Sequence, residues 1–339
     1  MATTVTIRDV AKRAGVGVGT VSRVLNDSEG VRETTRHKVK TAIEDLNYSP
    51  SPVARHLSRG KMMAIGVIVP FFTNASVVKR LQGIVSVLAG SEYDLVLFDV
   101  DNRENRDVLL TNILRRKMVD GLLILSLRPS DSDMEQFLKA GVPGVIVDAS
   151  HPQLHSVIVD NVEGGRLATQ HLIDLGHVKI GYISDYPYNP FNISPVRDRR
   201  EGYLRALDEA GIPYREEYYR EGGLDSQEAR GLALELLSLD DPPTAIFAYS
   251  DTQAIGVLEA ARDLGLRVPA DLSVVGYDDI ESAEFMQLTT VRQSLFDSGV
   301  TGARLLLDIM EQSTIYPREV LLPTELVIRS STAEPVRVH

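Results

Sequence analysis

Several side chains that could recognise a polar partner by donating hydrogen bonds lie close together near the amino terminus. Thr20, Ser22 and Arg23 stand within four residues, and each carries hydrogen-bond donors. A guanidinium can donate two parallel bonds to O6 and N7 of guanine, which discriminates against other bases by ~1–3 kcal/mol. Arg23 is therefore a candidate base reader. The alternative that it holds only a phosphate stays open, because many protein–DNA hydrogen bonds go to the backbone.

Glycines directly before these donors raise a second possibility, a loop that cradles a pyrophosphate. A dinucleotide-binding loop needs G-x-G-x-x-G spacing after a hydrophobic strand. The segment Gly15-Val-Gly-Val-Gly19 has different spacing, and the residues before it are charged and follow a helical pattern. The sequence therefore argues against a nucleotide cofactor, and we expect no cofactor of any kind.

Catalytic signatures are missing from the sequence. The chain has no Cys, which excludes a cysteine nucleophile and a thiolate zinc site. None of the seven His belongs to an H-E-x-x-H pair, and neither G-x-S-x-G nor a P-loop occurs. These observations predict a protein that is not an enzyme and holds no metal.

Three short helices are expected to position the amino-terminal donors. The first begins after Thr6, with Asp9 as a partner near the cap, and ends at Gly15. The second begins near Gly17, and the third runs from about Glu33 to Leu46 with an apolar stripe. Helices joined by a glycine turn are typical of a helix-turn-helix unit.

Charge is distributed unevenly along the 339 residues. Residues 1 to 60 contain ten Lys or Arg against six acidic residues, whereas the whole chain has a formal net charge of −11. A basic head on an acidic body indicates that the head meets a polyanion. No signal-like or membrane-length apolar segment occurs, which predicts a cytoplasmic protein without membrane association.

After Lys61, apolar strand-like runs alternate with amphipathic helical stretches. This order is typical of parallel sheets covered by helices on both faces, and the number of runs favours two doubly wound lobes. The clearest runs are 64–69, 95–98, 122–125, 145–147, 180–183, 245–249 and 273–276. Between head and body, Ser51 and Pro52 resemble the start of a helix over about 51–58, too short to be stable alone.

Residues 6 to 26 closely resemble the amino-terminal signature of the LacI/GalR family of bacterial transcription regulators, and the likeness extends to about Arg329. Motifs in the body that carry it are Asp160-Asn161 through Gly176-His177, Arg199-x-x-Gly202-Tyr203, Ser250-Asp251, Val275 to Asp279, and Leu288 to Gln293. The resemblance implies a helix-turn-helix domain over 1–60 and a periplasmic-binding-protein-like core of two α/β lobes. We expect lobe boundaries of 61–162 with 292–323, and 163–291 with 324–339.

The resemblance also implies which residues contact operator DNA. Thr6, Asn26 and Thr35 are expected at phosphates, and Leu57 is expected to enter the minor groove and bend the duplex. Leu57 as simple linker filler is the alternative. The full set of expected DNA contacts is Thr6, Val18, Thr20, Ser22, Arg23, Asn26, Thr35, Tyr48, Ser51, Ala54 and Leu57.

Two departures from the family pattern concern the second helix. The family usually has Ser at Gly17, and polar or larger side chains at Val18 and Gly19. Gly19 cannot contact a base, while Val18 can at most touch a thymine methyl. We therefore expect this helix to read fewer base edges than its relatives.

For the body, the resemblance implies a small effector, expected to be a sugar or sugar derivative, bound between the lobes. The expected contacts are Phe72, Ser76, Asp148, Arg199, Ser250 and Asp278. Alternatives are that Asp278 caps a helix and that Arg199 pairs with Asp198 or Glu201. The usual aromatic wall is missing at 74–77, and nearby aromatics (Phe71, Phe72, Tyr186, Tyr188 and Phe191) are candidates to replace it or to pack the interface.

The function predicted from these features is a homodimeric, effector-controlled DNA-binding regulator, expected to act as a repressor. A sugar-binding transport protein shares the two-lobed body but would need an export signal and no DNA-binding head. An α/β enzyme acting on sugars is the other rival. The tail after Arg329 lacks heptads, which argues against a coiled-coil tetramer.

Overall fold

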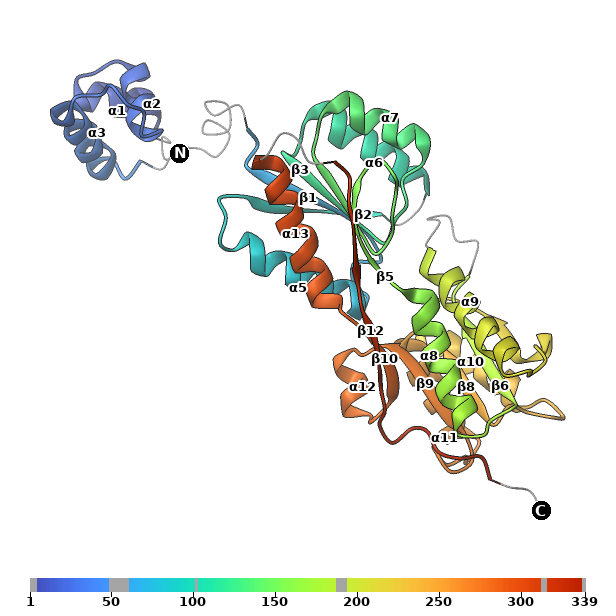
Figure 1. The fold of residues 1–339 in the computed structure, drawn as a ribbon. Coiled ribbons are helices and arrows are strands. Elements are labelled where there is room, and N and C mark those ends of the chain that lie inside the picture. Colours follow the sequence, from blue (N-terminus) through green and yellow to red (C-terminus); the bar gives the residue numbers. More distant parts are fainter. Residues whose placement is uncertain (1–4, 49–60, 101–102, 187–193, 312–315, 337–339) are drawn as a thin grey trace. The chain divides into compact units, whose positions relative to one another are not determined.

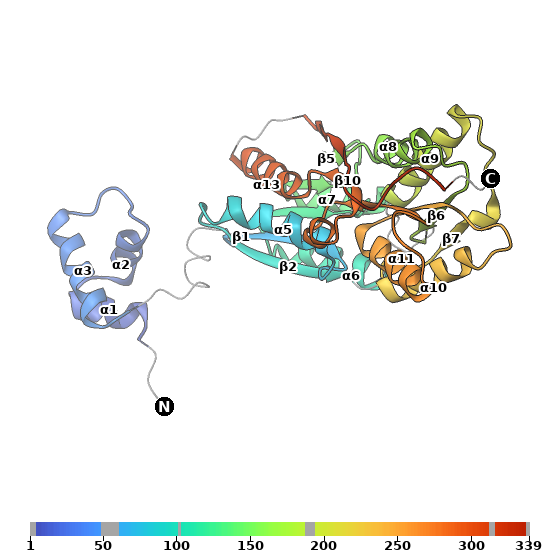
Figure 2. The same cartoon turned by 90° about the horizontal axis from the view of Figure 1, so that it is seen from below.

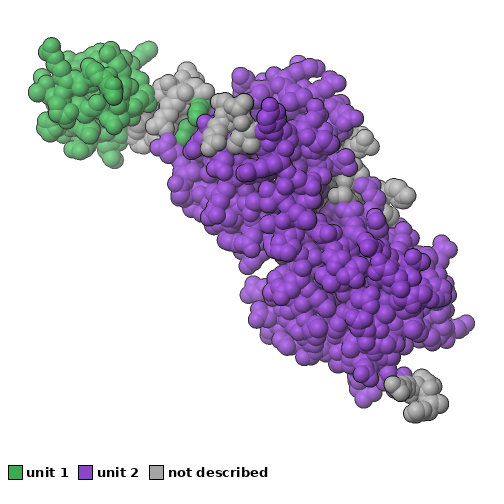
Figure 3. Space-filling view, viewed as in Figure 1, with its two compact units in different colours: residues 1–63 green, residues 64–339 purple. Residues whose placement is uncertain are grey.

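The computed structural model describes residues 5–48, 61–100, 103–186, 194–311 and 316–336, and the side chains of 103–107 and 194 lie outside this description. The chain divides into two compact units, residues 1–63 and residues 64–339 (Figure 3). Each unit is described separately below.

The amino-terminal unit consists of three helices around a small apolar core. These helices are α1 (Ile7–Ala14), α2 (Val18–Leu25) and α3 (Glu33–Asp45). Val10, Val21 and Val39 are fully buried at their centre. At the start of α1, the Thr6 backbone N–H donates to Asp9 Oδ2 over 2.9 Å, and Gly15 ends the helix at φ +66°. The predicted three-helix head is confirmed.

The larger unit contains two lobes, each built on a six-stranded sheet (Figure 1). In the first lobe the order is β11-β5-β4-β3-β1-β2, and all pairings are parallel. Its strands are β1 (Ala64–Pro70), β2 (Asp94–Val100), β3 (Gly121–Leu125), β4 (Gly144–Val147), β5 (His155–Val159) and β11 (Glu319–Leu322). Helices α5 (Ala75–Leu88) and α13 (Leu295–Glu311) pack side by side on one face, and α6 (Arg103–Arg116) and α7 (Asp131–Ala140) cover the other.

The second lobe repeats the plan, with the order β12-β10-β9-β8-β6-β7 and only β12 antiparallel to its neighbour. Its strands are β6 (Ile180–Ser184), β7 (Tyr219–Glu221), β8 (Ala245–Ala248), β9 (Ser273–Asp278), β10 (Thr289–Gln293) and β12 (Thr324–Val327). Helices α8 (Asn161–Asp174) and α9 (Ser194–Glu209) lie on one face, opposite α10 (Ser226–Leu237) and α11 (Asp251–Asp263) (Figure 2). A 3-10 turn (Glu216–Tyr218) and α12 (Glu281–Phe285) complete it.

The chain passes between the two lobes three times, after β5, after β10 and after β11. The two central sheets are buried, as expected for parallel strands covered on both faces: β1, β3 and β4 are buried along their whole length, as are β6, β8 and β9. The predicted fold, a helical head with two doubly wound lobes, is confirmed. Strands of both lobes end beside one cavity between the lobes, and polar residues stand at several of these ends.

Candidate functional site

Helix α2 presents the candidate base-reading face of the head. Val21 and Val24 face the core, while Val18 is 43% exposed and Gly19 and Arg23 are exposed. Thr20 and Ser22 are half-buried. The Arg23 Nε–H donates to the Gly19 carbonyl over 3.3 Å, so the guanidinium stem lies along the first turn of its own helix. The outward surface of the first turn thus carries no polar side chain at positions 18 and 19.

The other predicted DNA contacts occupy varied surroundings. The Thr6 hydroxyl donates to Asp9 over 2.7 Å, and these bonds lower the pKa of Asp9. Thr35 is half-buried in the first turn of α3. Asn26 ends α2, with its amide 3.5 Å from the Ser22 hydroxyl. Tyr48 is only 9% exposed and belongs to the head core, so in the structure it contributes to packing, and its DNA contact stays a prediction.

The predicted hinge helix lies outside the described residues. Ser51, Ala54 and Leu57, expected in the minor groove or at its edge, belong to that segment. Their DNA contacts remain predictions.

A cavity of about 60 Å³ lies between the two lobes, where strands of both sheets end. Ligands of open α/β sheets generally bind at the carboxyl ends of strands. The lining includes Ser126 after β3, Asp148 after β4, Asp185 after β6, Tyr249 after β8 and Asp278 at the end of β9. Four side chains that the sequence predicts for the effector site therefore meet here: Ser76, Asp148, Arg199 and Asp278.

On the first lobe, Asp148 is the central polar group of the cavity. Its Oδ2 accepts a hydrogen bond from the Ser126 hydroxyl over 2.8 Å, and its Oδ1 lies 3.0 Å from Arg80 Nη2. Ser126 and Asp148 both adopt left-handed backbone conformations, with φ of 54° and 67°. Such strain clusters at functional sites, because the surrounding structure must hold it in place.

On the second lobe, the Arg199 guanidinium is held on several sides. Its Nε–H donates to Asn161 Oδ1 over 3.0 Å, and Nη1 donates to the Tyr249 carbonyl over 2.7 Å. The guanidinium carbon lies 3.7 Å from the centre of the Tyr277 ring and 4.3 Å from that of Tyr249. These contacts leave little freedom of orientation, which suits a group that must meet a ligand in one geometry.

Asp278 pairs with this guanidinium at 3.6 Å, and it does not cap the next helix, whose N-cap is Ile280. Burial raises the pKa of Asp278, while Arg199 opposes that rise. Burial also raises the pKa of Asp185 to about 6. The cavity therefore combines two guanidinium groups with three carboxylates, a set able to bind hydroxyls and charged groups.

Two of the predicted effector contacts lie away from the cavity lining. The Ser250 hydroxyl accepts from the Gln253 backbone N–H over 3.2 Å and so caps α11. Phe72 is exposed, whereas its neighbour Phe71 lines the cavity. Tyr186 is exposed and its hydroxyl donates to Glu228, and Tyr188 and Phe191 lie outside the described residues.

Sequence reasoning missed several lining residues. Ser126 and Asp185 directly or closely follow an apolar run and Tyr249 ends one, and this position at a strand end could have indicated them. Arg80 and Gln293 carry no such signal. Arg80 lies within α5, and its approach to Asp148 depends on how that helix packs.

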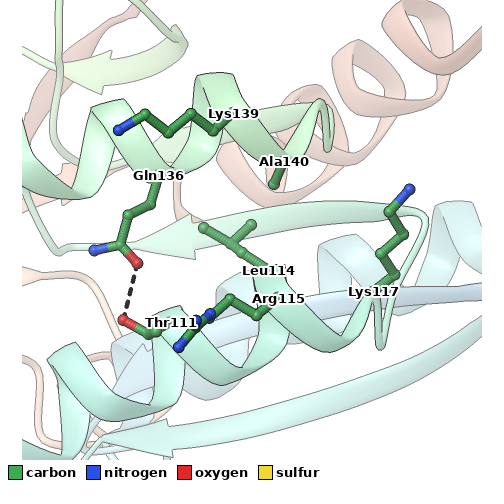
Figure 4. A pocket seen from close by; sticks show the side chains of 7 residues that line it. All are labelled: Thr111, Leu114, Arg115, Lys117, Gln136, Lys139 and Ala140. Carbon is green, nitrogen blue, oxygen red and sulfur yellow. Dashed lines mark hydrogen bonds between the residues drawn. The ribbon is translucent and has the colours of Figure 1, made fainter.

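A more open cavity of about 570 Å³ lies between α6 and α7 of the first lobe. Figure 4 shows Leu114 between the helices, with Arg115 and Lys117 on the α6 side and Lys139 on α7. The Thr111 hydroxyl donates to Gln136 over 2.9 Å. These cations are exposed and stand near the carboxyl ends of their helices, where they complement the helix dipole. This cavity is therefore a weaker candidate than the buried network between the lobes.

The described part of the chain contains no helix long and apolar enough to cross a membrane. Within the same residues, no group of three His, Asp or Glu side chains is placed to hold a metal ion.

Comparison with known proteins identifies both parts of the chain. Residues 6–51 match the family described as "Bacterial regulatory proteins, lacI family", and residues 169–332 match the "Periplasmic binding protein-like domain". Catabolite control protein A of Priestia megaterium is 36% identical over 97% of this chain and 99% of its own length. The transcriptional repressor PurR of Actinobacillus pleuropneumoniae serotype 3 is also 36% identical, over 96% of this chain and 98% of its own.

Solved structures agree with these relatives. The Lac repressor dimer bound to operator and the anti-inducer ONPF superposes with a TM-score of 0.83 at 32% identity, covering 97% of this chain and 99% of that one. The CelR–cellobiose complex gives a TM-score of 0.71 at 33% identity, over 96% and 99% of the two chains. The chain belongs to the LacI family of bacterial regulatory proteins.

Proposed function

We propose that this protein is a cytoplasmic, homodimeric transcriptional repressor whose operator affinity is set by a small effector bound between the lobes. The observation that carries the proposal is the likeness, over nearly the whole chain, to a repressor dimer bound to operator. The basic head with the exposed α2 supports the DNA-binding half. The buried polar cavity supports the effector half, and cellobiose and ribose in related structures favour a sugar or sugar derivative.

In this proposal α2 enters the major groove, with Arg23 as the main base reader and Thr20 and Ser22 beside it. Thr6, Asn26 and Thr35 hold phosphates, and the segment 51–58 with Leu57 enters the minor groove. An effector changes operator affinity only if it prefers one of two arrangements of the lobes. A coupling free energy of ~1–3 kcal/mol would change that affinity about 5- to 150-fold.

DNA binding can be tested by fluorescence anisotropy on fragments from the protein's own regulatory region, over a range of salt concentrations. If Arg23 reads a base, Arg23→Ala should reduce the preference for operator over random duplex by ~1–3 kcal/mol and leave the salt dependence nearly unchanged. If Arg23 holds a phosphate, both duplexes should be weakened together and the salt slope should fall by about 1.

Arg13→Ala is the matched control, because Arg13 is also a cation of the head but pairs with Asp45 at 2.6 Å. It should change neither preference nor slope strongly. A wild-type protein that shows equal affinity for every duplex, with and without metabolites, would contradict the proposal.

The effector half can be tested by thermal shift with sugars, nucleosides and sugar phosphates on the wild type and Arg199→Lys. Lysine keeps the charge but loses the planar group held by Asn161 and Tyr249. We expect a hit for the wild type to be lost or weakened in the variant. A hit that Arg199→Lys leaves unchanged would place the ligand elsewhere.

A further inference from the structure

Arg80 connects the two lobes from inside the cavity. It lies on α5 of the first lobe and is 2% exposed. Its Nη2 lies 3.0 Å from Asp148 Oδ1 of the same lobe and donates to Gln293 Oε1 over 2.9 Å. Gln293 is the last residue of β10, in the sheet of the second lobe. The Arg80 guanidinium therefore contacts residues of both lobes, as an effector bound between the lobes would.

The contacts continue beyond Gln293 into the second lobe. The Gln293 amide donates to Asp278 Oδ1, and that same oxygen lies 3.6 Å from Arg199 Nη1. A chain of buried polar groups therefore runs from Ser126 and Asp148 through Arg80 and Gln293 to Asp278 and Arg199. Contacts of this kind are stronger inside a protein than in water, so they stabilise the arrangement of the lobes seen in this structure.

Little space remains beside the Arg80 side chain. The cavity holds about 60 Å³, whereas pockets for small molecules usually measure roughly 300–1,000 Å³. The backbone of Arg80 is fixed by α13, because a Cβ on Gly299 would lie 2.1 Å from the Arg80 carbonyl oxygen. Room for an effector must therefore come from movement of the Arg80 side chain or of the lobes.

Two buried atoms at this point, Arg80 Nε and Asp148 Oδ1, have no hydrogen-bond partner among the residues that the structure describes. The first is a donor on a cation, and the second is an acceptor whose contact with Arg80 is an ion pair without hydrogen-bond geometry. A buried polar group is costly unless a water, an ion or another polar atom satisfies it. An occupant that donates to Asp148 and accepts from Arg80 would satisfy both.

On the basis of the proposed function, we propose that Arg80 is a built-in occupant of the effector site and selects effectors that combine hydroxyls with an anionic group. A hydroxyl would replace Arg80 at Asp148, and a carboxylate or phosphate would pair with the displaced guanidinium. A neutral sugar bound at Asp148 would leave the Arg80 charge buried without an anionic partner, which is strongly unfavourable. The effector class is therefore an anionic sugar derivative rather than a neutral sugar.

The test compares the binding of D-glucose, D-glucuronate and D-glucose 6-phosphate to the full-length protein by isothermal titration calorimetry. At least one anionic probe should bind at least tenfold more tightly than glucose. Glucuronate and glucose 6-phosphate distinguish a carboxylate from a phosphate. In Arg80→Met, which keeps the length but not the charge, this preference should disappear, and neutral glucose should bind no worse than in the wild type.

Lys79→Met is the matched control, because Lys79 is the adjacent cation on the same helix, is exposed and does not line this cavity. It should keep the wild-type preference. Equal binding of neutral and anionic probes by the wild type, or no binding of either anionic probe, would overturn the proposal. Operator binding measured in parallel reports on the proposed function separately, since neither substitution touches the head.

Hydrogen exchange provides a readout that needs no ligand. If Arg80 holds the lobes together, amides in 144–149 and 289–295 should exchange several-fold faster in Arg80→Met than in Lys79→Met. Equal exchange in the two variants would show that Arg80 does not bridge the lobes in solution.

Discussion

The cavity between the lobes is assembled from residues whose native states are costly for folding. Arg80, Asp148, Arg199 and Asp278 are all buried, and Asp278 adopts a φ of 118°. A buried ion pair rarely stabilises a protein more than a well-packed apolar pair of similar volume would. The presence of four such charges in one cavity, two at strand ends and two on helices, is therefore better explained by ligand recognition than by stability.

Gly15 and Gly19 form a natural pair for measuring backbone effects in the head. A Cβ on either would meet no atom within 4 Å, but Gly15 has φ +66° and Gly19 lies within α2. Gly19→Ala should stabilise the head by ~0.5–1 kcal/mol, because glycine loses more conformational freedom in a helix than alanine does. Native-state hydrogen exchange of amides in 7–45 would give the change in the free energy of opening.

Gly15→Ala serves as the opposite member of the pair. It should destabilise the head by ~1–2 kcal/mol, because alanine is strained in the left-handed region. If both substitutions changed stability in the same direction, the helical geometry assigned to position 19 would be wrong.

At this scale the sequence indicated some residues of the site and not others. Asp148 and Asp278 follow or end apolar runs, so a polar group at the end of a buried strand was visible without a structure. Arg80 and Gln293 could not be recognised in this way. Arg80 lies on a helix and Gln293 at the end of a mixed strand, and the two meet only when the lobes pack together. The family resemblance implied that Tyr48 contacts DNA, and only the structure shows that Tyr48 also belongs to the core of the small head.

Among the strands, those with continuous apolar sequences could be predicted from the sequence, and those that mix apolar and polar residues could not. Strands β1, β3, β6, β8 and β9 appear as continuous hydrophobic runs because both faces of each are buried. The sequences of β10, β11 and β12 contain Thr, Arg or Glu, and their exposed positions interrupt any run. Their place in the sheets depends on pairing between residues far apart in the chain.

The carboxyl-terminal segment 330–334 contacts two histidines of the second lobe. His177 Nε2 lies 2.9 Å from the Ala333 carbonyl, and His171 Nε2 lies 2.9 Å from the Thr332 hydroxyl. Burial lowers the pKa of both histidines from 6.5. The segment is therefore attached through side chains whose neutral form is favoured by burial in the folded state.

This arrangement predicts that the segment loosens in acid. A lowered folded pKa means that the unfolded state binds more protons below about pH 6.5, so stability is present above that pH and is lost as the pH falls. Opening of 330–334 should increase by at most ~tenfold per pH unit for each histidine between pH 6.5 and 5. Hydrogen exchange of these amides, corrected for the intrinsic effect of pH, would measure it.

His177→Gln is the control for this prediction, since glutamine can still donate to Ala333 but does not titrate. The pH dependence should be smaller in this variant. A dependence as steep as that of the wild type would exclude His177 as a source.

For the molecule as a whole, the exposed apolar residues of α5 and α12 bear on assembly. Val78 and Val85 of α5 are exposed, and Phe285 of α12 is 89% exposed. Both helices line one groove of about 470 Å³, so they border the same side of the two lobes. Val78 lines this groove, whereas Val85 and Phe285 belong to the helices that border it. A contact between subunits at these two helices would bury all three side chains and agrees with the proposed homodimer.

Phe285→Ser should therefore weaken dimerisation at least tenfold, because burying a Phe side chain contributes ~1.5–3 kcal/mol. Sedimentation velocity over a concentration series would report the shift from dimer to monomer. Leu138→Ser on α7 is the control, because Leu138 is also exposed but lies on a helix that does not line the groove. An equal effect of both substitutions would point to general destabilisation.

The three passages of the chain between the lobes have a consequence for how such proteins can be recombined. Neither lobe is one continuous stretch, since each takes strands from both sides of the crossings after β5, β10 and β11. Exchanging a lobe between two relatives would require several simultaneous splice points, whereas residues 1–63 form one uninterrupted block. A regulator that combines a new DNA target with a new effector should therefore arise more readily by exchange of the amino-terminal unit than by exchange of one lobe.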